Sequence, residues 1–160
     1  MSVTTVAHLH LLLNHIPILG PIFVTILFVV ALFYRNVFLQ KVSLWFLVGI
    51  ALFTAATYLT GDKAVLAVQG LPGISQEMIR SHELFAKYGL GSMFVTGAIA
   101  LGGALFYSRK PSIPRPFLTA ILVILLLNCC LFAYIGFLGG QIHHPEIRNA
   151  PLIQRLRVLL

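Results

Sequence analysis

Four long apolar runs alternate with polar connectors along the chain. They cover approximately residues 11–34, 42–59, 84–107 and 117–138. A helix needs about 20 mostly apolar residues to cross the hydrocarbon core of a bilayer, and each run reaches or approaches that length. The pattern therefore predicts an all-α fold, an integral membrane four-helix bundle, formed by a single domain over residues 1–160. A loop at 60–83 joins the second and third spans, and a C-terminal tail covers 139–160.

Composition agrees with a membrane protein. Hydrophobic residues make up 59% of the chain and charged residues only 9%, too few charges to cover the surface of a soluble domain. The net charge of +7 does not indicate nucleic-acid binding, because the basic residues are scattered and flank the apolar runs. The first run lacks the basic start and small-residue cleavage site of a signal peptide, so we expect it to be a retained span. The lipid bilayer is the expected partner.

The connectors predict the orientation. Four spans place both termini on one side of the membrane, and the connectors "RNVFLQK" and "SRKPSIPRP" lie on the other. Both connectors are basic and contain no acidic residue. Because short basic loops stay in the cytoplasm, the termini are predicted to be periplasmic. The expected location is the bacterial cytoplasmic (inner) membrane, with multiple passes.

All histidines and all carboxylates fall at the end of the bundle that carries the termini. They are His8, His10, His15, His82, His143, His144, Asp62, Glu77, Glu83 and Glu146. Ionisable groups near a bilayer are costly unless they are paired, hydrated or ligated, so their presence there indicates a functional site. Imidazole nitrogen binds transition metals and haem iron. The sequence therefore predicts a histidine-rich site on the periplasmic face.

The first two spans carry local signals around these residues. Asn14 is a good helix cap and Pro17 suits a first turn, so the first helix is expected to start near them and to leave His10 on a flexible approach segment. After the second span, Asp62 is expected to cap a short helix that ends at Val68.

Similar signals surround the third and fourth spans. Ser75 predicts the start of the helix that carries His82. Gly139 and Gly140 predict a left-handed helix end and a sharp reversal after the fourth span, which would bring the following histidines back over the bundle. Pro145 is expected to end regular structure, with Glu146 and Arg148 pairing beyond it.

Small residues recur every four positions in the third span, at Ser92, Thr96, Ala100 and Ala104. Such a stripe lets helices approach closely. The alternative is a flat cofactor that lies against the stripe.

The chain resembles a bacterial family of four-span membrane proteins catalogued as a domain of unknown function. Its opening pattern, H-P-x-x-x-H-F-P, is matched by His10, His15, Ile16 and Pro17, with Leu11 in place of the first proline. "TGDKA" matches a small-Gly-acid-x-Ala element, His82 matches a histidine near the start of span three, and "LGGQIHHPEI" matches a Gly-Gly exit from span four. The resemblance implies a companion of respiratory redox components whose histidines hold haem b or another metal.

The main hypothesis is an electron-transfer module or subunit of a respiratory redox complex that holds haem b. His15 and His82 are the expected ligands, with His10 and either His143 or His144 as supporting or alternative ligands. Electrons would pass between a quinol pool and a periplasmic partner.

Two alternatives remain open. A non-haem Cu or Zn site would use His10, His15, His82 and a carboxylate, Asp62 or Glu83. A structural or assembly subunit would bind only protein through its polar end. An enzyme is the least supported class, because no serine or cysteine nucleophile lies beside a base and no phosphate-binding loop is present. Metal-assisted chemistry with Glu83 as the base is the only catalytic role that these residues suggest.

Overall fold

The structure, a computed structural model, describes residues 2–148. Within this range the chain is helical and has no strand. The helices are α1 (Val3–Leu13), α2 (His15–Phe33), α3 (Val37–Val68), α4 (Gln76–Phe106), α5 (Arg115–His143) and α6 (Pro145–Arg148). Helices α1 and α2 follow one another as a single apolar segment, so the described residues form four helical segments long and apolar enough to cross a membrane. The predicted four-helix membrane bundle is confirmed.

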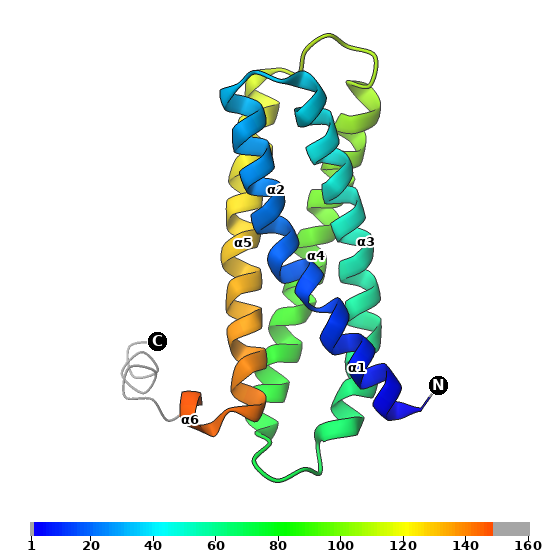
Figure 1. The fold of residues 1–160 in the computed structure, drawn as a ribbon, viewed down its shortest axis with the longest axis vertical. Helices are drawn as coiled ribbons and strands as arrows, with labels where there is room; N and C mark the ends of the chain where they lie inside the picture. Colours follow the sequence, from blue (N-terminus) through cyan, green and yellow to red (C-terminus); the bar gives the residue numbers. More distant parts are fainter. Residues whose placement is uncertain (1, 149–160) are drawn as a thin grey trace.

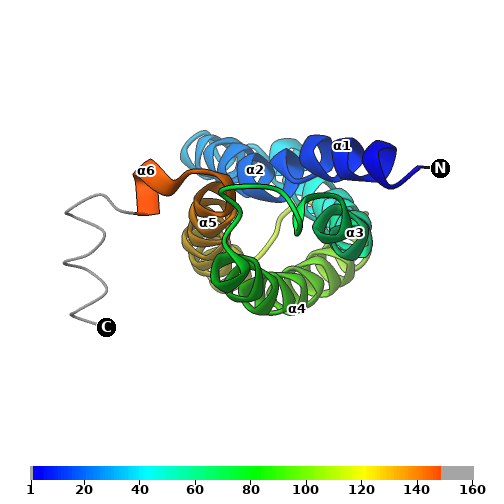
Figure 2. The ribbon, with the colours of Figure 1, turned by 90° about the horizontal axis from the view of Figure 1, so that it is seen from below.

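The four long segments lie side by side along the length of the molecule (Figure 1). The beginning of α1 and the helix α6 lie at one end, and the α2–α3 turn and the α4–α5 loop lie at the other. Viewed from the first of these ends, the helices surround a common centre (Figure 2). Both ends of the described chain therefore lie at the same end of the bundle, as predicted.

The interior of the bundle and its outer surface are both apolar. Phe28, Leu47, Met93 and Leu125 are fully buried at the centre. Large apolar side chains cover the outer surface as well, among them Phe53, which is 49% exposed. Soluble proteins rarely expose apolar patches beyond a few hundred Å², so this surface is suited to lipid. The chain is a multi-pass membrane protein.

Close helix contacts hold α4 in place. Thr96, Ala100 and Ala104 on its small-residue stripe are buried. At Gly97, a Cβ atom would lie 2.5 Å from the Cβ of Ala51 on α3, so these two backbones approach as closely as glycine allows. The stripe serves helix packing, the first of the two interpretations.

A polar network in the middle of the bundle joins α4 to α5. Asn128 is 1% exposed. Its side-chain nitrogen donates to Thr96 Oγ1 (2.9 Å) and to the Ile124 carbonyl (3.0 Å), and its oxygen accepts from Ser92 Oγ (3.0 Å). Because lipid offers no hydrogen-bond partners, such internally satisfied groups favour one pairing of helices.

The helices extend beyond the apolar runs. Helix α3 continues to Val68, so Asp62 lies inside a long helix and does not cap a short one. No proline interrupts "TGDKAVLAV", and the extension packs against α1. Ser75 accepts a hydrogen bond from the Met78 amide (3.3 Å) at the start of α4, as predicted. Only residues 69–75 of the expected loop connect the two helices.

The expected reversal after the fourth span is wrong. Gly139 and Gly140 lie inside α5, which continues to His143. Gly139 serves a close side-chain contact, described below, and not a turn. Pro145 begins the short helix α6 instead of ending regular structure, because proline needs no N–H in a first helical turn.

Candidate functional site

A kink between α1 and α2 shapes the predicted site. Pro17 has no N–H, so the Leu13 carbonyl, four residues earlier, lacks its helical donor. The Thr57 hydroxyl of α3 lies 3.2 Å from that oxygen and 2.9 Å from the Phe53 carbonyl, and its proton serves both. On the adjacent turn, His15 Nδ1 donates to the Leu11 carbonyl (2.8 Å). The break is therefore stabilised by hydrogen bonds from α3 and from His15.

The kink directs α1 across α3 (Figure 1). Helix α2 packs against both α3 and α5, whereas α1 packs against α3 and makes no contact with α5 in the described part of the chain. His10 lies on α1, which begins at Val3 with Ser2 as its cap. The expectation that His10 lies on a flexible approach segment is therefore wrong. Ser2, and not Asn14, caps the start of the helix that carries His10, and this helix begins at Val3, eleven residues before Asn14.

The divergence of α1 opens a cavity of about 540 Å³ among α1, α2, α3, α4 and α5. This volume lies in the range of small-molecule and cofactor sites. Apolar side chains form much of the wall, including Ile18, Val65, Ile79, Phe132 and Ile135. The cavity is also lined by every residue that the sequence analysis selected for the site: His10, His15, Asp62, His82, Glu83, His143 and His144.

His10 is half-buried on the α1 side of the cavity. Its Nδ1 lies 3.0 Å from the Thr57 carbonyl and 3.0 Å from Thr60 Oγ1. The Thr60 hydroxyl donates its own proton to the same Thr57 carbonyl (2.7 Å). A carbonyl only accepts, so Nδ1 carries the proton, and the neutral ring has its lone pair on Nε2.

His82 is half-buried on the α4 side. Its Nδ1 donates to the Ile135 carbonyl of α5 (3.0 Å), which assigns the lone pair of the neutral ring to Nε2. Gly139 permits this position, since a Cβ there would lie 3.2 Å from His82 Cε1 and 3.3 Å from Nδ1.

Both Nε2 atoms are accessible. Neither Nε2 has a hydrogen-bond partner within the described residues. Every buried side-chain nitrogen and oxygen in that part of the chain does have a partner, so these two atoms are not buried. The cavity is thus lined by two imidazoles from different helices, each with an accessible Nε2.

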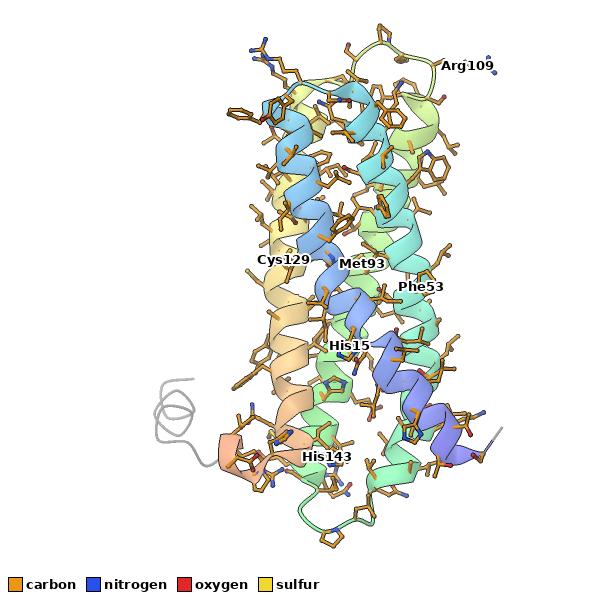
Figure 3. The ribbon with its side chains drawn as sticks, viewed as in Figure 1. His15, Phe53, Met93, Arg109, Cys129 and His143 are labelled. Carbon is orange, nitrogen blue, oxygen red and sulfur yellow. The ribbon has the colours of Figure 1, made fainter. Side chains whose placement is uncertain are left out.

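The other three histidines of the cavity wall, His15, His143 and His144, are exposed. His15 lies beside the α1–α2 kink, and His143 lies at the end of α5 (Figure 3). His144 Nδ1 lies 2.7 Å from Glu146 Oε1. The expected pairing of Glu146 with Arg148 is replaced by this contact, because the Arg148 guanidinium donates instead to the carbonyls of Gln141, Ile142 and Gly73.

The two carboxylates of the cavity wall, Asp62 and Glu83, are exposed. Glu83 pairs with Lys87 one turn further along α4, at 3.4 Å. Among the residues that the structure describes, no three His, Cys, Asp or Glu side chains are placed to hold one metal ion. The set of His15, His82, Asp62 and Glu83 is therefore brought to one cavity but not to one coordination centre.

Three supporting residues were not selected from the sequence. Thr57 and Thr60, three positions apart, share the helix face that receives His10. Gly139 was interpreted as a helix end, although a glycine in a helix also permits close approach of a side chain from a neighbouring helix. The sequence signal that could have identified this face was the pair of threonines at this spacing in an otherwise apolar helix.

Comparison with family models, curated proteins and solved structures gives no match to this chain.

Proposed function

We propose that this protein is an electron-transfer module of the membrane that holds haem b in the cavity, with His10 and His82 as the iron ligands. One observation carries the proposal. Each of these imidazoles lines the same cavity, donates Nδ1–H to a backbone carbonyl and has an accessible Nε2 with no partner among the described residues. Such a carbonyl contact is the usual way in which proteins fix the tautomer and orientation of a ligand histidine.

The hydrogen bonds favour a different pair from the one expected from the sequence. His15 was the expected partner of His82, but its Nδ1 is bonded within its own helical segment and its side chain is exposed. His10 is anchored to α3 and half-buried. We therefore assign His15 to the kink and to the cavity rim, with His143 and His144 also at the rim.

The cavity has the chemistry that a haem group needs. Two neutral imidazoles come from α1 and α4, and much of the cavity wall is apolar. Haem would supply one-electron redox chemistry there. His10 and His82 would hold the iron, while Phe132 and Ile135 would limit solvent access.

The proposed role is to pass electrons between quinol in the bilayer and a periplasmic partner, as a subunit of a respiratory complex in the bacterial inner membrane. The membrane-spanning helices and the basic connectors at the opposite end support this placement. A Cu or Zn site built on His10, His82 and a carboxylate would require Asp62 or Glu83 to move inward. A cofactor-free assembly subunit would leave the two lone pairs unused.

The test is to purify the protein from bacterial membranes in mild detergent and to record oxidised and reduced visible spectra with metal analysis. We expect sharp reduced bands that are lost in His10→Ala and in His82→Ala. His8→Ala is the matched control, because His8 is exposed on the same helix and does not line the cavity. A colourless protein with stoichiometric Cu or Zn would contradict haem and support the metal site. Absence of both would support the assembly role.

A further inference from the structure

The basic residues at the opposite end of the bundle are not equivalent. Lys41 Nζ donates to the Ser108 and Lys110 carbonyls, both at 2.9 Å, and ties α3 to the α4–α5 loop. Lys110 Nζ lies over the Phe106 ring, 3.5 Å from its centroid. By contrast, the side chains of Arg35 and Arg115 make no hydrogen bond or ion pair within the described residues. The guanidinium groups of Arg35 and Arg115 therefore remain available.

Arg35 and Arg115 line the same pocket, of about 550 Å³, between the α2–α3 turn and the beginning of α5. Gln40, Ser112 and Thr119 add amide and hydroxyl donors. Gln40 is 5% exposed and uses one N–H for the Ala31 carbonyl (3.4 Å), so its amide nitrogen has a second N–H. No acidic residue lines the pocket.

The backbone at Arg35 is unusual for a side chain of this size. Its φ angle is +51°, the only positive φ among the described non-glycine residues. Glycine is the usual residue at such a helix end, where the amides of Arg35 and Asn36 bond back to Leu32 and Ala31. The helix end would form more easily with glycine at position 35. Helix termination therefore does not explain why an arginine occupies this position beside the pocket.

We propose that this pocket binds the phosphate of an anionic phospholipid. Guanidinium groups bind phosphate through paired, charge-assisted hydrogen bonds, and basic pockets between membrane helices commonly hold lipid headgroups. Leu32, Phe33 and Leu118 provide apolar wall beside the donors, which suits the glycerol and acyl chains of a lipid. Because the pocket lies at the end of the membrane-spanning helices, we assign a lipid source and not free phosphate.

The test uses full-length protein in nanodiscs of phosphatidylcholine containing a minor fraction of phosphatidylglycerol. After extraction into non-ionic detergent, native mass spectrometry measures the phosphatidylglycerol that each protein retains. We expect wild-type protein to retain it and Arg35→Gln/Arg115→Gln to lose about tenfold or more. Arg109→Gln is the matched control, since Arg109 lies in the same loop region, points away from the bundle (Figure 3) and does not line the pocket. It should retain the lipid within about twofold of wild type.

Further arms of the experiment separate a lipid pocket from general surface charge and from a free-phosphate site. Arg35→Gly removes the guanidinium while it favours the left-handed backbone, so loss of lipid without loss of thermal stability would support the pocket. An equal loss in Arg109→Gln would overturn it in favour of general surface charge. Displacement of the lipid by millimolar inorganic phosphate would overturn the lipid assignment and indicate a free-phosphate site. Failure of wild-type protein to retain phosphatidylglycerol above phosphatidylcholine would also overturn it.

Discussion

Gly139 on α5 packs against the imidazole of His82 on α4, so closely that a Cβ at Gly139 would lie 3.2 Å from His82 Cε1. The same ring donates to the Ile135 carbonyl one turn earlier on α5. One helix therefore both positions the ring and accepts its hydrogen bond, and this arrangement fixes which ring nitrogen keeps its lone pair.

The first prediction concerns this contact. Gly139→Val should displace the His82 ring, weaken its bond to Ile135 and destabilise the protein by about 1–3 kcal/mol. Any cofactor content should fall with it. Gly140→Val is the matched control, because a Cβ at Gly140 meets nothing within 4 Å. Thermal unfolding in detergent and reduced visible spectra measure the two effects, and equal behaviour of both variants would contradict the contact.

The second prediction concerns the kink. Thr57→Val removes the hydroxyl that bonds the Leu13 carbonyl, an oxygen that Pro17 leaves without a helical donor. The loss should cost about 1–3 kcal/mol and increase hydrogen exchange along α1. Thr54→Val should have a smaller effect on α1, because the Thr54 hydroxyl bonds only the Ile50 carbonyl of its own helix. Unchanged exchange in α1 of Thr57→Val would contradict this role.

The third prediction concerns the α3–α4 interface. Gly97→Ala places a methyl group 2.5 Å from the Ala51 methyl, and neither can rotate away. The helices must separate, which should cost about 1–3 kcal/mol. Gly102→Ala meets nothing within 4 Å and should stabilise the helix by up to about 1 kcal/mol. Unfolding in a denaturing detergent compares the two, and a Gly97→Ala variant as stable as Gly102→Ala would show that the interface is loose.

The fourth prediction concerns pH. Hydrogen bonds from its own backbone amide and from His144 hold the pKa of Glu146 below its ordinary value of 4.5. A depressed carboxyl pKa favours the folded arrangement above pH 4.5, and this contribution is lost as pH falls through the native pKa. A carbon-detected NMR titration of Glu146 in wild type and His144→Ala measures it. We expect a higher pKa in the variant, and an unchanged value would contradict the contact.

Hydrophobic patterning was sufficient to predict the architecture. Runs of membrane-spanning length, basic connectors and the capping residue Ser75 identified the helices and the shared end of the termini. These features depend on local composition, which a single sequence shows directly. The same clustering identified the histidines and carboxylates of the cavity wall, because four spans necessarily bring alternate connectors to one end.

Contacts between helices could not be predicted in this way. His10, rather than His15, is anchored to α3, because Thr57 and Thr60 of that helix accept a hydrogen bond from its Nδ1. Gly139 has the same local sequence signal whether it ends a helix or accommodates a ring. Arg148 was expected to pair with an acid nearby in sequence, yet backbone carbonyls at Gly73, Gln141 and Ile142 surround its guanidinium.

The Thr57 bond to the Leu13 carbonyl has a consequence for biosynthesis. The first span leaves the ribosome before α3 has been made, and during that interval lipid provides no donor for the oxygen that Pro17 leaves free. The bent form gains this hydrogen bond only when α3 arrives alongside. Insertion of the second span thus completes the hydrogen bonding of the kink, and a nascent chain truncated before Thr57 should have a first span that lacks this bond.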